Sequence, residues 1–185
     1  MMPAPSAPDV RDRLLRATAA LDAAGVPYAV VGRQAVAGWV ARIDETAVRD
    51  SDDAQILLRR ADFPAARVAL ETAGFLYRHS VGFDFFVDGE DGKVREAIHV
   101  VFANETIRKD YTQAALDVVP YELAPPFRML PFAQLVRMLL SSFRIEDRID
   151  LRDLVDVGLI DDAYLDQLPD DLALRLRGIF DTDNP

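Results

Sequence analysis

Two short apolar segments joined through a glycine constrain the fold of this chain most. Residues 28–31 and 54–58 are too short for stable helices and are rich in valine, isoleucine and leucine, which is typical of buried strands. Gly32 ends the first segment, and residues 34–41 then carry apolar side chains at helical spacing. We therefore expect strand, glycine, helix, loop and strand in succession across residues 28–58.

The same alternation of helix and strand surrounds this unit. A helix is expected from Asp9, another is expected to be capped by Asp62, and further strands are expected at residues 75–77, 83–87 and 97–102. Beyond a connector with three prolines at 120–126, helical spacing returns after Pro131, around Leu151 and after Pro169. This order predicts an α+β fold, with a mixed β-sheet, flanking helices and a small C-terminal helical lobe. The expected division is a flexible tail at 1–8, an α/β core at 9–119 and the lobe at 120–185.

The composition excludes several classes of function. With 21 Lys and Arg against 31 Asp and Glu, the net charge is −10. Such an acidic chain lacks the basic surface that non-specific DNA or RNA binding requires. The absence of cysteine excludes disulfides and thiolate metal sites. No signal peptide is recognisable, and no apolar run approaches the ~20 residues that span a bilayer, so we expect a cytoplasmic protein without membrane contact.

Three acidic residues precede the second buried segment. Asp50, Asp52 and Asp53 crowd negative charge at the start of a strand, which a divalent cation would offset. Gly32, between a strand and a helix, would let backbone N–H groups approach a phosphate. The competing interpretation is that the acids only cap and solvate a loop, and the residues by themselves favour it.

Taken together, these segments resemble the signature of a known fold. The signature is an apolar strand, a Gly-Gly or Gly-Ser pair, a helix, and then Arg-x-Thr-x-Asp-φ-Asp before a second apolar strand, where φ is apolar. The matching residues here are Val30-Val31-Gly32-Arg33-Gln34 and Arg49-x-Ser51-x-Asp53-Ala54-Gln55-Ile56-Leu57-Leu58. The chain thus resembles the nucleotidyltransferase-fold superfamily of DNA polymerase beta, and within it the small bacterial nucleotidyltransferases and AbiEii-like toxin proteins. The similarity runs from about Val10 to Leu168.

The resemblance implies a chemistry and a set of site residues. In such enzymes the two aspartates, with a third acid from a later strand, hold Mg²⁺, and a nucleoside monophosphate passes from an NTP to a hydroxyl. Asp53 would then be a metal ligand, and Asp84 or Glu96 a further one. Gly32 and Ser51 would contact phosphate, and Arg49 would position it.

The sequence departs from this pattern at its centre. Gln55 stands where the second aspartate belongs, and a neutral amide is a poor ligand for a hard cation. Arg33 replaces the second small residue, where it would either crowd the phosphates or place a cation beside them. His99 stands where many members of the superfamily carry an acid, and Leu139 where the helix of close relatives often carries Lys.

These departures predict a degenerate member of the superfamily, a pseudoenzyme. It would bind a nucleotide, or a protein or RNA partner, with weak or no magnesium-dependent turnover and no required cofactor. The alternative is an active, toxin-like nucleotidyltransferase that uses Mg²⁺ to move NMP from NTP to a hydroxyl of RNA, protein or a small molecule.

Overall fold

The computed structural model describes residues 10–105, 116–119, 121–124 and 127–182. Its helices are α1 (Val10–Ala23), α2 (Gly32–Ala41), α3 (Phe63–Thr72), α4 (Phe132–Ser142), α5 (Ile145–Asp156) and α6 (Asp170–Asp181). Its strands are β1 (Tyr28–Val31), β2 (Ala54–Leu58), β3 (Phe75–Ser80), β4 (Phe83–Asp88), β5 (Ile98–Phe102), β6 (Glu122–Ala124) and β7 (Phe127–Met129). Within these ranges, every helix is too short or too polar to cross a bilayer.

The strands of the described residues form one mixed sheet in the order β3-β4-β5-β2-β1-β7-β6. Strand β1 pairs antiparallel with β2 and parallel with β7, and β2 pairs parallel with β5. The expected α+β class with a mixed sheet is therefore confirmed. The two strands that frame the glycine turn have the bounds that the sequence predicts, because a breaker or a polar loop limits each apolar run.

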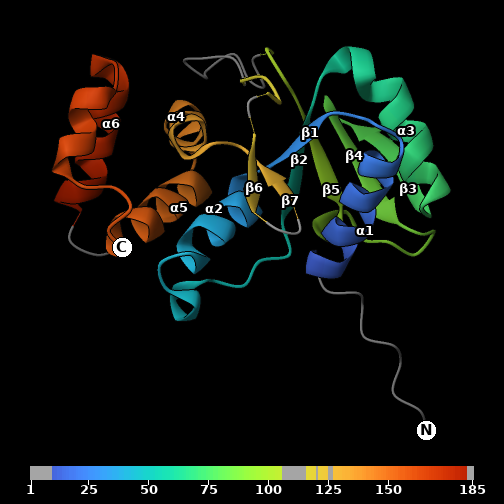
Figure 1. Cartoon of the computed structure of the whole chain (residues 1–185), viewed down its shortest axis with the longest axis horizontal. Coiled ribbons are helices and arrows are strands. Elements are labelled where there is room, and N and C mark those ends of the chain that lie inside the picture. The colour runs from blue at the N-terminus through green and yellow to red at the C-terminus, as the bar shows by residue number, and fades with distance from the viewer. Residues whose placement is uncertain (1–9, 106–115, 120, 125–126, 183–185) are drawn as a thin grey trace, which may run out of the picture.

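Helices α1 and α3 cover one face of the sheet (Figure 1). Phe63, at the start of α3, packs its ring against Phe86 of β4 and Phe102 of β5, with centroids 6.2 and 5.4 Å apart. Successive residues of a strand point to opposite faces. Gln55 and His99, which are paired in the β2–β5 register, consequently face away from these helices.

Helix α2 lies between the sheet and the C-terminal helices (Figure 1). It packs against β1 and β2 on one side and against α4 and α5 on the other. The expected helical lobe is present as α4, α5 and α6, whose contacts bury Leu139, Leu154 and Leu176. Leu139, at the position where close relatives often carry Lys, is therefore a core residue.

The segment 120–126 differs from its expectation as a plain connector. It contains β6, and the following β7 joins the sheet beside β1 through the pair Val30 and Met129. The sheet thus extends past residue 119, the expected end of the α/β core. Three-residue strands carry too short an alternation of side chains for a sequence pattern to reveal them.

Helix starts also differ from the sequence expectations. Asp62 precedes α3 without capping it, because its backbone is already helical (φ −89°, ψ −8°) and its side chain accepts no cap hydrogen bond. A 3₁₀ turn at Arg60–Asp62 runs directly into this helix. Helix α2 begins at Gly32, two residues before the expected Gln34. Asp9, the expected cap of the first helix, lies outside the described residues.

Candidate functional site

The turn from β1 into α2 depends on Gly32. Its φ of +62° lies in the left-handed region, where a Cβ introduces strain. A Cβ at this position would also lie 3.0 Å from the Cδ and 3.1 Å from the Oε1 of Gln55. The glycine therefore allows the Gln55 side chain to lie directly against the turn that the resemblance assigns to phosphate.

Gln55 and Asp53 form a hydrogen-bonded pair beside this turn. The Nε2 of Gln55 donates to the Oδ2 of Asp53 over 2.8 Å, and both residues are partly buried. The pair carries one negative charge, where two aspartates would carry two. An amide N–H also occupies one of the carboxylate oxygens that would otherwise accept a cation.

The loop that carries Asp53 is held by two further side chains. The Oγ of Ser51 accepts a hydrogen bond from the backbone N–H of Asp53 over 3.1 Å, which is the contact of a loop-capping serine. The Nε2 of Gln34 donates to the backbone carbonyls of Ser51 and Asp53 over 3.2 and 3.1 Å. The sequence pattern did not predict this role of Gln34, although its position in the first turn of the helix after Gly32 was a signal for it.

Arg33 and Arg49, both assigned to the nucleotide, instead contact carboxylates of α5. The Nη1 of Arg33 donates to Asp150, and also to the Oδ2 of Asp153 over 2.9 Å. The Nε of Arg49 lies 2.9 Å from the other oxygen of Asp153. The structure brings these two arginines together on the C-terminal lobe, whereas Gly32, Ser51, Asp53 and Gln55 gather at the start of β2.

The two acids that bind these arginines share one side of α5 with a third acid, Asp147, which pairs with Arg144. Asp147, Asp150 and Asp153 are three residues apart and all buried. Burial raises the pKa of Asp150 to about 7; Arg33 opposes this shift, and the charges of Asp147 and Asp153 add to it. Their regular spacing in a helix with buried leucines is a signal of a shared face, but it does not indicate Arg33 and Arg49 as their partners.

Asp84 lies on the opposite face of the sheet from Gln55. It pairs with Val100 in the β4–β5 register, and Gln55 pairs with the neighbouring His99. Its Oδ1 accepts hydrogen bonds from the Tyr77 hydroxyl (2.6 Å) and from Nδ1 of His79 (3.0 Å). Burial raises the pKa of Asp84, but these two hydrogen bonds, together with the charges of His79 and Arg60, lower the pKa below its ordinary value. The structure therefore does not bring Asp84 to Asp53.

Glu96 ends a 3₁₀ turn just before β5. Its Oε1 lies 3.3 Å from the Nε of Arg95 and 3.8 Å from the Nζ of Lys93. His99 is half-buried, with its ring centroid 5.7 Å from that of Phe85. In the part of the chain that the structure describes, no group of three or more His, Asp or Glu side chains is arranged to hold a metal ion.

Comparison with known proteins identifies the fold. No protein-family model matches the chain, and no curated protein matches it. A solution structure of the antibiotic-resistance factor ANT(2'')-Ia, an aminoglycoside nucleotidyltransferase, superposes with a TM-score of 0.54 at 14% identity, over 93% of this chain and 92% of that one. A crystal structure of ANT(2'')-Ia in complex with adenylyl-2''-tobramycin gives a TM-score of 0.49 at 15% identity, over 90% and 96% of the two chains. The glycine turn, the mixed sheet and the first of these superpositions agree: the chain has the nucleotidyltransferase fold.

Proposed function

We propose that this protein binds a nucleotide through its nucleotidyltransferase fold and carries out little or no magnesium-dependent transfer. The observation that carries the proposal is the 2.8 Å hydrogen bond from Gln55 to Asp53. Magnesium prefers anionic oxygens in a near-octahedral arrangement. A single carboxylate that already accepts a hydrogen bond from the neighbouring amide therefore provides too few anionic ligands for that ion.

The start of α2 supports nucleotide binding. The N-cap residue is Val31, whose side chain offers no acceptor to the first-turn N–H groups. Unsatisfied N–H groups at a helix N-terminus favour an anion such as phosphate. A solved structure that superposes with a TM-score of 0.54 is that of an aminoglycoside nucleotidyltransferase, an enzyme class that uses a nucleotide. Three points stay predictions from the resemblance: the acceptor molecule, an RNA or protein partner, and a kinship to AbiEii-like toxins.

The test combines transfer and metal binding in the natural chain and in Gln55→Asp. The natural chain is expected to release no more pyrophosphate from NTP and Mg²⁺ than Asp53→Asn does, and to bind ATP with similar affinity with and without Mg²⁺ in calorimetry. Gln55→Asp places two carboxylates together, which repel one another without a cation. Its melting temperature should therefore fall in EDTA and rise again when Mg²⁺ is added.

Gln167→Asp is the matched control, because it adds the same charge at an exposed position of the helical lobe. Its melting temperature should not respond to Mg²⁺. Magnesium-dependent transfer by the natural chain that Asp53→Asn abolishes would reject the proposal and establish the active alternative. A natural chain that binds no nucleotide would reject the binding half alone.

A further inference from the structure

His99 of β5 lies beside the residues of the candidate site. The strand registers pair Gln55 with Val31 of β1 on one side and with His99 on the other. Paired residues of neighbouring strands point to the same face of a sheet, and such strands lie ~4.8 Å apart. Because Gln55 lies against the Gly32 turn, His99 is one strand away from the turn that the resemblance assigns to phosphate.

The imidazole of His99 offers a donor that the protein leaves unused. Its ring is half-buried, and within the part of the chain that the structure describes its nitrogens form no hydrogen bond or ion pair. The Oδ2 of Asp53, just before β2, already accepts a hydrogen bond from Gln55. A neutral imidazole carries one N–H group and a protonated one carries two, so at least one N–H of His99 is available to a ligand.

Phe85 of β4 restricts this imidazole from the other side. The two residues are paired in the β4–β5 register, and their ring centroids lie 5.7 Å apart. The Phe85 side chain is buried with Val87 and Ala97 in a small apolar cluster. A donor that is already ordered by such a contact loses less freedom when it binds a ligand.

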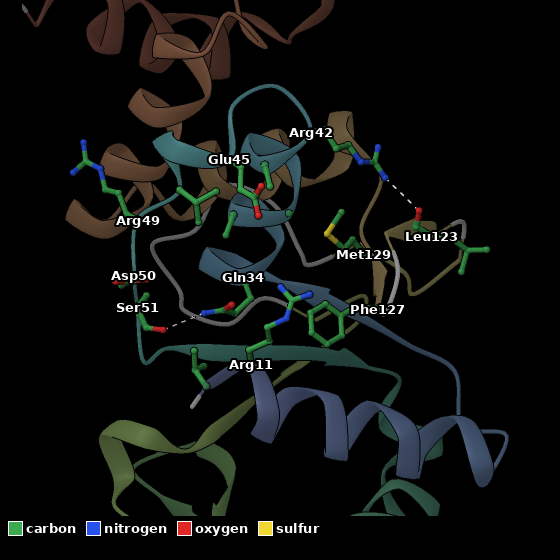
Figure 2. A pocket seen from close by; sticks show the side chains of 15 residues that line it. Arg11, Gln34, Arg42, Glu45, Arg49, Asp50, Ser51, Leu123, Phe127 and Met129 are labelled. Carbon is green, nitrogen blue, oxygen red and sulfur yellow. Dashed lines mark hydrogen bonds between the residues drawn. The ribbon is translucent and has the colours of Figure 1, made fainter. Parts of the chain in front are cut away.

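The two arginines that the resemblance assigns to the nucleotide are already engaged. Arg33 and Arg49 both bind carboxylates of α5. In Figure 2 the Arg49 side chain points away from Ser51. Because both guanidinium groups are held by the helical lobe, a phosphate at the Gly32 turn needs a donor from another element.

We propose that His99 binds a phosphate group of the nucleotide directly, through a ring N–H. An imidazole donates to a phosphate oxygen, whereas a carboxylate in its place would repel the phosphate unless a cation lay between them. This inference rests on the proposed function and adds to it a residue that holds the phosphates without Mg²⁺. The site should therefore discriminate between a nucleotide and its nucleoside through His99.

Calorimetry with ATP and with adenosine, both in EDTA, measures what the phosphates contribute to binding. His99→Phe keeps an aromatic ring beside Phe85 and removes the N–H donor. It should weaken ATP binding about tenfold, the effect of one charge-assisted hydrogen bond, and leave adenosine binding unchanged. His99→Gln retains an N–H donor on a side chain of similar length and should recover part of the ATP affinity.

His79→Phe is the matched control. His79 is the other of the chain's two histidines, and it contacts Asp84 on the opposite face of the sheet. Its replacement should leave the affinity for ATP unchanged. With two histidines in the chain, His79→Phe also assigns the two imidazole signals in NMR spectra.

These imidazole signals give a readout that a purely structural role of His99 would not change. ATP should shift the His99 signal of the natural chain, and adenosine should shift it much less. If the natural chain binds ATP but His99→Phe binds it equally well, or loses ATP and adenosine affinity alike, the inference is overturned and the proposed function stands. A natural chain that binds neither ATP nor adenosine would reject nucleotide binding itself, and this inference with it.

Discussion

Arg33, in the first turn of α2, donates a 2.9 Å hydrogen bond to Asp153 of α5, 120 positions further along the chain. This contact ties the turn after β1 to the C-terminal lobe. Arg33 also donates to Asp150, and its side chain is only 15% exposed. An arginine that the sequence assigns to a nucleotide is thereby a structural link between the two halves of the protein.

Replacing this arginine should destabilise the protein strongly. Arg33→Met leaves the buried Asp150 without its counter-charge and Asp153 with Arg49 alone, and breaking a buried pair from one side costs about 3–5 kcal/mol. Urea unfolding measures this loss. Arg95→Met, which removes a surface pair whose arginine is 72% exposed, is the control and should cost no more than about 1 kcal/mol. Equal losses in the two variants would show that the Arg33 link does not support the fold.

Stability should fall as the pH rises from about 4 to about 7. The pKa of Asp150 is raised by burial from 3.8 to about 7, so the folded chain retains a proton that the unfolded chain releases. This contribution to stability is present in full below pH ~4 and is lost as the pH rises through the pKa of Asp150 in the folded state. One pKa unit corresponds to about 1.4 kcal/mol, which limits the effect to about 4 kcal/mol.

The variant that tests this pH dependence is Asp150→Asn. Its free energy of unfolding, measured in urea at several pH values, should change less between about pH 4 and about pH 7 than that of the natural chain. Asp156→Asn removes an exposed acid from the same helix and should keep the natural slope. The assignment of this pH dependence to Asp150 fails if the free energy of unfolding of the two variants changes with pH in the same way.

Gly32→Ala should cost more than the same change at Gly25. Both glycines have positive φ, +62° and +67°, and a left-handed alanine costs about 1–2 kcal/mol. Only at Gly32 would the new Cβ also meet another side chain, that of Gln55. Thermal unfolding should show a larger loss of stability for Gly32→Ala than for Gly25→Ala. Adding Gln55→Ser to Gly32→Ala should reduce its loss to that of Gly25→Ala. A loss that Gln55→Ser does not change would contradict the contact.

Gln34→Met should loosen the loop that carries Asp53. It removes both hydrogen bonds to the carbonyls of Ser51 and Asp53, each contributing about 1 kcal/mol. Amide hydrogen exchange at Asp53 should accelerate by roughly tenfold or more. The control Gln167→Met, on the surface of the lobe, should leave that rate unchanged. Unaltered exchange in Gln34→Met would mean that other contacts hold the loop.

The local chemistry of the chain was sufficient to predict β1, β2 and the glycine between them. Their bounds follow from apolar runs limited by breakers, and Gly32 lies beside Gln55 because the antiparallel β1–β2 register pairs Val31 with Gln55. The same local information missed β6 and β7, since three residues carry almost no periodic signal.

The sequence by itself thus determined the class of fold and the neutral amide beside Asp53. Only the tertiary structure decided which charges meet. Arg33 and Arg49 reach Asp150 and Asp153 because α5 packs on α2, and Asp84 is kept from Asp53 because the β4–β5 register turns it to the other face. Pairing between distant residues depends on how whole elements pack, and no local spacing encodes that arrangement.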